Sequence, residues 1–167
     1  MAQFRFNYDT MLLCGRSGSG KTTFLKSIVS KTKRYVVIDT AYCFRESPQE
    51  NRIRPVGFSA EALDDMLLGI LKTHTNFLLV IDDIDSYSPL QSKVLNVLAV
   101  IGRHQNVGLA ISSRRPLRLP KTVIANMRYI VTFAGVLGDD LDYLYQNTGI
   151  QIRAPSRMFE HYVYRTF

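Results

Sequence analysis

Residues 15–22 form a glycine-rich turn whose spacing fits a loop that wraps around phosphate groups. The run reads Gly15-Arg16-Ser17-Gly18-Ser19-Gly20-Lys21-Thr22 and directly follows the apolar stretch 11–14. Glycine permits a tight turn that points successive backbone N–H groups at an anion, and the start of the next helix adds partial positive charge. The chain is therefore restricted to folds in which a strand, this loop and a helix follow one another.

The loop predicts a nucleoside triphosphate ligand, with ATP and Mg²⁺ as the expected cofactors. In this pattern Lys21 reaches the β and γ phosphates, and the hydroxyl of Thr22 holds Mg²⁺. The predicted nucleotide-binding residues are Gly15, Arg16, Ser17, Gly18, Ser19, Gly20, Lys21, Thr22 and Thr23. The choice between ATP and GTP stays open, because purine contacts come from scattered loops.

Length and composition indicate one soluble domain over residues 1–167, long enough to bury a normal core. No apolar run approaches the roughly 20 residues of a membrane span, and the N-terminus lacks the apolar core of a signal peptide. The two cysteines, Cys14 and Cys43, predict no disulfide framework. We expect a protein that is not secreted and has no transmembrane segment.

Apolar runs rich in β-branched residues alternate with helical patterns, which predicts an α/β fold with a mostly parallel central sheet and helices on both faces. Strands are expected near residues 10–14, 34–39, 53–57, 77–82, 107–112 and 128–133, and helices near 20–31, 59–73, 88–104 and 137–147. The pair at 88–89 is a serine followed by proline, a common helix start. The apolar stripe expected on that helix consists of Leu90, Val94, Leu98 and Ile101. The tail 159–167 alternates enough to form an edge strand or a hairpin arm.

A second nucleotide motif ends the buried strand 77–82, where Asp82 and Asp83 stand together. A carboxylate at the carboxyl edge of a parallel sheet lies beside the phosphate loop. We expect Asp82 to complete the Mg²⁺ site through water, opposite Thr22, and Asp83 to orient and deprotonate the attacking water. Aspartate is shorter than the glutamate more common in that role. Either the loop compensates, or hydrolysis is slow, or Asp85 takes part.

Polar and basic residues after this motif are candidates for sensing and stabilising the γ-phosphate. Ser112 or Ser113, at the end of the strand beside the loop, would link the γ-phosphate to movement, or would simply cap the strand. Arg103, Arg114 and Arg115 would stabilise the transferring phosphoryl group. Arg103 sits at the far end of its helix, so it is a better candidate for action in trans, across a subunit interface.

The net charge of +7 is concentrated in the second half of the chain. Residues 86–167 carry 10 Lys/Arg against 4 Asp/Glu, whereas residues 1–85 carry 11 against 10. A basic half suits a polyanionic partner, because Lys and Arg release counterions from phosphates. Simple solubility is the alternative. The DNA-binding candidates are Arg114, Arg115, Arg118 and Lys121.

After the paired acids the sequence runs in a set order: Gly102-Arg103, a short polar turn, the strand near 107–112, Arg115-Pro116, Pro120 and the run 129–133. By this order the chain resembles the HerA–FtsK superfamily of P-loop motor ATPases, and the similarity covers residues 10–134. The small size is similar to the genome-packaging ATPases of membrane-containing icosahedral viruses, including archaeal ones. The resemblance implies a RecA-like fold and a homo-oligomeric ring that moves double-stranded DNA. It also implies contact with viral capsid or inner-membrane proteins, in the host cytoplasm or the virion.

Carried over by position, the resemblance gives Lys21 and Thr22 the phosphate and Mg²⁺ contacts, and Asp82 the second part of the metal site. Asp83 takes the place of the usual glutamate, and Arg103 matches the arginine offered to a neighbouring subunit. Ser113 falls where these motors often have glutamine. Asp39 falls where they often have an aspartate, and it would be a structural residue or would support the residues that contact the ligand.

Two functions other than a motor are also compatible with these motifs. A small P-loop kinase would use Arg114 or Arg115 as lid residues, but it has less need of Asp83, since its acceptor replaces the attacking water. A nucleotide-binding assembly subunit that hydrolyses poorly would explain the short Asp83 and the missing glutamine. The histidines and cysteines show no zinc-ligand spacing.

Overall fold

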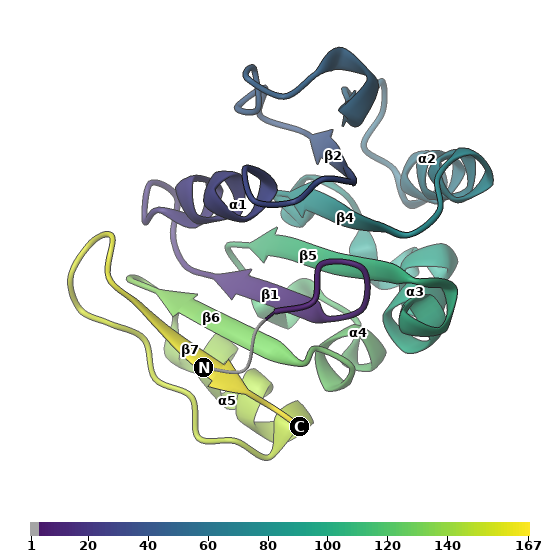
Figure 1. Ribbon diagram of the computed structural model, residues 1–167. Coiled ribbons are helices and arrows are strands. Elements are labelled where there is room, and N and C mark those ends of the chain that lie inside the picture. Colours follow the sequence, from purple (N-terminus) through teal and green to yellow (C-terminus); the bar gives the residue numbers. More distant parts are fainter. Residues whose placement is uncertain (1–3) are drawn as a thin grey trace.

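The computed structural model describes residues 4–167, which form a seven-stranded sheet of order β3-β2-β4-β5-β1-β6-β7 (Figure 1). The strands are β1 (Thr10–Cys14), β2 (Tyr35–Asp39), β3 (Arg52–Ile53), β4 (Phe77–Asp82), β5 (Val107–Ser113), β6 (Tyr129–Phe133) and β7 (His161–Arg165). The helices are α1 (Lys21–Val29), α2 (Ala60–Thr73), α3 (Lys93–Ile101), α4 (Lys121–Ala125) and α5 (Gly138–Thr148). All strand pairs are parallel except β6–β7, which is antiparallel. The predicted mostly parallel α/β sheet is confirmed.

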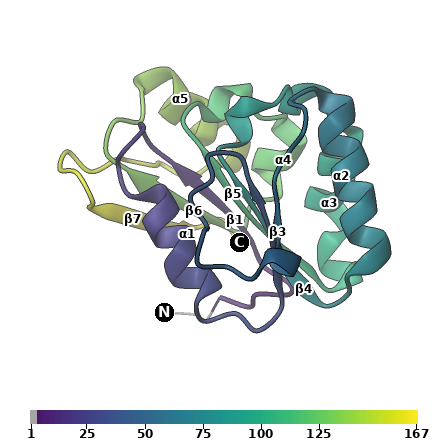
Figure 2. The ribbon, with the colours of Figure 1, turned by 90° about the horizontal axis from the view of Figure 1, so that it is seen from above.

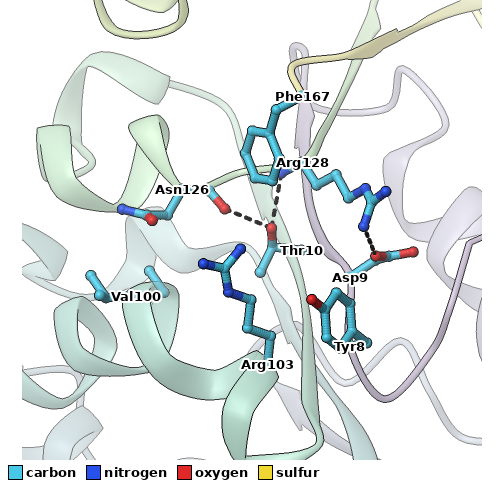
Figure 3. A pocket seen from close by; sticks show the side chains of 9 residues that line it. Tyr8, Asp9, Thr10, Val100, Arg103, Asn126, Arg128 and Phe167 are labelled. Carbon is cyan, nitrogen blue, oxygen red and sulfur yellow. Dashed lines mark hydrogen bonds and ion pairs between the residues drawn. The ribbon is translucent and has the colours of Figure 1, made fainter.

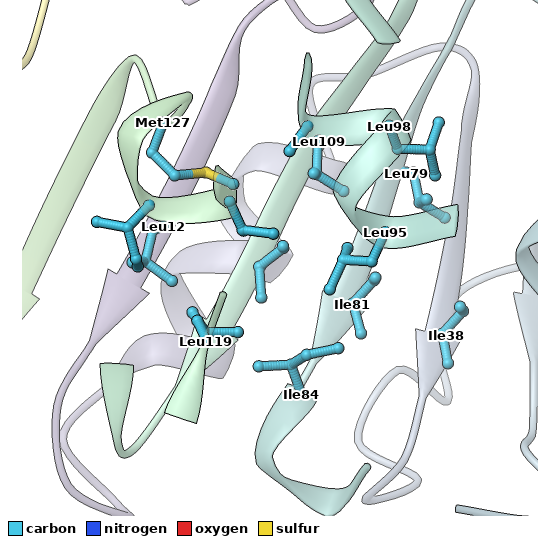
Figure 4. Packing of buried hydrophobic residues seen from close by; sticks show 14 of the residues in the cluster. Leu12, Ile38, Leu79, Ile81, Ile84, Leu95, Leu98, Leu109, Leu119 and Met127 are labelled. Atoms are coloured by element: carbon cyan, nitrogen blue, oxygen red, sulfur yellow. The ribbon is translucent and has the colours of Figure 1, made fainter. Parts of the chain in front are cut away.

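Helices cover both faces of the sheet, because successive residues of each buried strand point to opposite sides. In β1, Leu12 faces a large apolar cluster with α2, α3, α4 and α5, and Leu13 faces a smaller cluster with α1. Figure 2 shows α1 on one side of the sheet and the other helices along the opposite side. Figure 4 shows the larger cluster, where Leu79 and Ile81 of β4 pack near Leu95 of α3. This packing fixes the carboxyl ends of β1, β4 and β5 relative to one another.

The third predicted helix begins later than expected, and its apolar stripe is different. Pro89–Gln91 is a separate 3₁₀ turn, and α3 starts after Ser92, whose hydroxyl accepts from the N–H of Leu95 at 3.1 Å. The register therefore follows the Ser92 cap. The buried side chains are Leu95, Leu98 and Ala99, while Leu90 is 59% exposed and Ile101 42% exposed. The predicted stripe was wrong at those two positions.

The C-terminal tail forms an edge strand, as predicted. This strand, β7, pairs with β6 from Tyr129↔Arg165 to Phe133↔His161.

Two internal elements differ from the prediction. The strand predicted at 53–57 is only the two-residue β3, and the short helix α4 was not predicted. Within residues 4–167, no helix combines the length and the apolar character that crossing a membrane requires.

Candidate nucleotide site

The phosphate loop connects β1 to α1 and is tied to the strands on both sides of β1. The N–H of Gly15 donates to the carbonyl of Ser113, the last residue of β5, at 3.3 Å, and the N–H of Arg16 donates to the carbonyl of Ala134, just after β6, at 3.1 Å. Gly18 and Gly20 have φ angles of 75° and 108°, in the region that favours glycine. The two inner glycines are therefore required by the turn itself.

Lys21 lies buried within this loop. Its Nζ donates to the carbonyl of Gly15 at 2.7 Å and to that of Arg16 at 2.9 Å. Burial lowers the pKa of Lys21, while the nearby carboxylates, first of all Asp82, raise it. The loop also buries the Ser19 hydroxyl, which has no hydrogen-bond partner within residues 4–167. A buried ammonium and an unpaired hydroxyl are groups that an anion in the loop would satisfy.

Thr22 and Asp82 meet across the site, although they are far apart in the sequence. The Thr22 hydroxyl donates to Asp82 Oδ2 at 3.0 Å, and the Ser112 hydroxyl donates to Asp82 Oδ1 at 2.6 Å. Burial raises the pKa of Asp82, and these two hydrogen bonds lower it. The predicted proximity of the glycine turn and the paired acids is confirmed.

The donor set fits Mg²⁺. Hydroxyl and carboxylate oxygens are its preferred protein ligands, and Mg²⁺ usually keeps several water and phosphate ligands besides. The described part of the chain has no group of three or more His, Cys, Asp or Glu side chains that could hold a metal ion. Thr22 and Asp82 are the residues that would hold the ion together with a triphosphate.

Asp83 occupies a sharply turned position directly after β4. Its backbone is left-handed, with φ 56° and ψ 60°, and its N–H donates to the Ser112 hydroxyl at 2.8 Å. Arg114 Nε donates to Asp83 Oδ1 at 3.0 Å, and the Ser86 hydroxyl lies 3.3 Å from Oδ2. The Asp83 side chain is 29% exposed, so this carboxylate is accessible at the edge of the site.

Asp85, the alternative base, is buried and faces the end of β5. Its Oδ1 accepts from the Ser113 hydroxyl at 3.0 Å, and its Oδ2 accepts from the N–H of Arg114. Both oxygens are thus occupied by the turn after β5. Ser113 therefore bonds Asp85, while Ser112 contacts both acids of the nucleotide motif; of the two serines, Ser112 is the one that touches Asp82 and Asp83.

Two predicted basic residues lie in ion pairs. Arg114 contacts Asp83, as above, and Arg115 Nε contacts the fully buried Asp140 at 2.9 Å. Asp140 also accepts from the N–H of Leu117 at 3.0 Å, so it anchors the segment after β5. Sequence reasoning missed Asp140, because an acid in the first turn of a helix ordinarily faces solvent.

The other predicted residues are placed as follows. Arg118 and Lys121 are exposed. Asp39 accepts from the N–H groups of Cys43 and Phe44 at 2.8 and 3.0 Å, which agrees with a structural role. Arg103 lies near Thr10, the first residue of β1, and Figure 3 shows it directed toward a small cavity beside Asn126. The phosphate loop follows the last residue of β1, so Arg103 is at the opposite edge of the sheet.

Residues 11–133 match the ATPase family associated with various cellular activities (AAA). The chain belongs to this AAA family of ATPases. No curated protein sequence matches it at a significant level.

Several solved structures share the fold of this AAA ATPase. The genome packaging NTPase B204 from Sulfolobus turreted icosahedral virus 2, in complex with ATP-gammaS, has a TM-score of 0.73 at 16% identity, over 95% of this chain and 92% of that one. B204, the DNA-packaging ATPase from Sulfolobus Turreted Icosahedral Virus, has a TM-score of 0.64 at 16% identity, over 98% and 94%. The N-terminal domain of zonular occludens toxin from Neisseria meningitidis gives 0.53 at 16% identity, over 74% and 75%. The AAA ATPase thus matches the viral NTPases over nearly its whole length.

Proposed function

We propose that this AAA ATPase is a genome-packaging motor, a single domain that hydrolyses ATP with Mg²⁺ in a homo-oligomeric ring and moves double-stranded DNA. The observation that carries the proposal is the contact of Thr22 with Asp82, which joins the phosphate loop to the paired acids in one site. The fold shared with two viral packaging NTPases over more than nine-tenths of this chain supports the packaging role.

Each residue of the site has a distinct task in this mechanism. Lys21 and the loop N–H groups bind the phosphates, and a Mg²⁺ held by Thr22 and Asp82 would neutralise the charge on the β and γ phosphates. Asp83 orients the attacking water and accepts its proton. Ser112 fixes both acids, since it donates to Asp82 and accepts from the Asp83 N–H.

Arg114 regulates this base. The ion pair holds the Asp83 carboxylate on the guanidinium, so hydrolysis requires Asp83 to leave Arg114 and contact water. The two serve as a latch at the end of β4 and β5. A weakly hydrolysing assembly subunit is the second candidate function, and this ion pair is the observation that favours it.

The DNA-facing part of the proposal involves exposed cations. Within residues 4–167, Arg118 and Lys121 are the members of the predicted DNA-binding group that form no ion pair, whereas Asp83 and Asp140 hold Arg114 and Arg115. Arg103 acts in trans, since its position at the far edge of the sheet keeps it from the nucleotide of its own subunit. Contact with capsid or inner-membrane proteins, within the virion or the host cytoplasm, belongs to the same proposal.

The experiment is steady-state phosphate release from ATP with and without double-stranded DNA, with Lys21→Ala as the inactive control. A motor shows hydrolysis that DNA stimulates. A kinase consumes ATP when a small acceptor is supplied, but it forms ADP without free phosphate, because the phosphoryl group goes to the acceptor. An assembly subunit responds to neither DNA nor an acceptor. Mixing Arg103→Ala with Lys21→Ala subunits tests action in trans, because each variant supplies what the other lacks. Full activity of a homo-oligomer of Arg103→Ala would remove that residue from the mechanism.

A further inference from the structure

The segment 158–161, which leads from the loop after α5 into the first residue of β7, runs beside the phosphate loop (Figure 1). Arg16 Nη2 donates to the Met158 sulfur at 3.0 Å. A methyl group added to Gly20 would lie 3.3 Å from Cδ1 of Phe159. These contacts place the Phe159 ring against the turn that holds the phosphates.

The Phe159 ring borders an open cavity at the start of α1. The cavity is about 130 Å³, and its lining consists of Gly18, Gly20, Lys21, Thr22, Thr23 and Phe159. All of these except Phe159 belong to the phosphate loop or the first turn of α1. The ring itself is 71% exposed, so an apolar surface stands uncovered at the mouth of a phosphate-binding cavity.

The contacts on either side fix the backbone that carries this ring. The His161 ring packs against Phe24 of α1 and Phe133 of β6, with ring centroids 4.9 and 5.4 Å apart. Phe159 has a φ of 65°, which non-glycine residues seldom adopt and which the surrounding contacts must maintain. The fold therefore holds the Phe159 backbone in a specific conformation beside the phosphate loop.

The order of the strands indicates which side of the cavity faces the γ-phosphate of a bound nucleotide and which side faces its nucleoside. Asp82 ends β4 and Asp83 follows it, while Ser112 is the last residue but one of β5; both strands lie on one side of β1. A γ-phosphate that reaches these groups points to that side, so the nucleoside leaves the loop toward β6 and β7. Phe159 lies on this second side.

We propose that Phe159 stacks on the base of the bound nucleotide, so that the segment 158–161 forms the nucleoside half of the site. This inference rests on the nucleotide binding of the proposed function. A phenyl ring stacks on any base but overlaps more with a two-ring purine, so the contact selects purine over pyrimidine nucleotides without separating ATP from GTP.

The test uses the absence of tryptophan from this sequence. Phe159→Trp introduces a single indole at the site, and Tyr145→Trp, at a position of α5 that is 55% exposed, is the matched control. Saturating ATP should quench the emission of Phe159→Trp and leave that of Tyr145→Trp unchanged. Inorganic tripolyphosphate should compete with ATP without quenching either variant, because it has no base.

Calorimetry of Phe159→Ala completes the test. Its affinity for ATP should fall about 5- to 150-fold, the effect of losing one base–aromatic stack, while its affinity for tripolyphosphate should be unchanged. Unaltered ATP affinity, equal loss for tripolyphosphate, or constant emission of Phe159→Trp at ATP saturation would each overturn the assignment. If the unmodified chain fails to bind ATP, the proposed function itself is wrong.

Discussion

Arg114 Nε donates to Asp83 Oδ1 at 3.0 Å, so the candidate base is paired with the cation that directly follows the neighbouring strand β5. The two residues come from the ends of β4 and β5, and the same turn also binds Asp85 through the N–H of Arg114. The paired acids are therefore coupled to the segment that follows β5. Movement of that segment changes whether the Asp83 carboxylate is held by Arg114 or is released to contact water.

Removing this pair should raise hydrolysis in the absence of DNA. Arg114 and Asp83 are 47% and 29% exposed, and a pair of this kind contributes up to about 1 kcal/mol, or roughly fivefold in rate. We expect Arg114→Ala to release phosphate about 3- to 5-fold faster without DNA and to respond less to added DNA. Arg114→Lys, which keeps the charge, should behave like the unmodified chain. A fall in the basal rate of Arg114→Ala would show that the guanidinium stabilises the reacting phosphate instead.

Ser112 should be required for the metal site as well as for catalysis. Its hydroxyl lies 2.6 Å from Asp82 Oδ1 and 2.8 Å from the N of Asp83. In Ser112→Ala the buried N–H and carboxylate lose a partner, which costs about 1–3 kcal/mol of unfolding free energy. We expect a higher Mg²⁺ requirement and about tenfold slower hydrolysis, both restored by Ser112→Thr. Titration of Mg²⁺ against phosphate release measures this, and an unchanged Mg²⁺ requirement would contradict it.

Acid pH should affect the Mg²⁺ site earlier than an ordinary aspartate would allow. Burial raises the pKa of Asp82 above its usual 3.8, so Asp82 gains its proton at a higher pH than a free side chain. Protonated Asp82 binds Mg²⁺ poorly, and the apparent Mg²⁺ affinity should fall as the pH drops through that raised pKa. Phosphate release at several Mg²⁺ concentrations across the acid range measures the effect.

Acid pH should weaken Mg²⁺ binding at Asp82 but increase the contribution of this residue to folding stability. A raised carboxyl pKa means that the folded chain binds this proton more tightly than the unfolded chain, so acidification through the raised pKa increases the contribution of Asp82 to the unfolding free energy. Asp82→Asn should remove that increase. Equal pH dependence of unfolding in both proteins would contradict the assignment of the raised pKa to Asp82.

Much of the site could be predicted because it lies in short sequence motifs. The turn around Lys21 and the strand ending in Asp82 each follow local rules, and parallel strands bring their carboxyl ends to one edge. Once the fold class is predicted, the contact between these two motifs follows from it.

The start of α3 was predicted too early, because two serines can each cap the helix. The hydrogen bond between Ser92 and Leu95 decides where the helix begins.

What could not be predicted depends on contacts between distant segments. Nothing near Asp140 in the sequence indicates that it is buried against Arg115, and the position of Phe159 beside Gly20 follows from how the chain returns after α5. The choice between Ser112 and Ser113 was open for a related reason. The two residues point to opposite sides of β5, and only the neighbouring strands show that Ser112 faces the nucleotide acids.

The measurement that tests the central claim most directly compares nucleotide affinity and phosphate release in Asp83→Asn. This variant keeps the size of the side chain and the loop contacts of Lys21, so ATP should bind within about twofold of the unmodified chain, while phosphate release falls at least about 100-fold. Hydrolysis at the normal rate would contradict the account and transfer the role of base to Asp85 or another group.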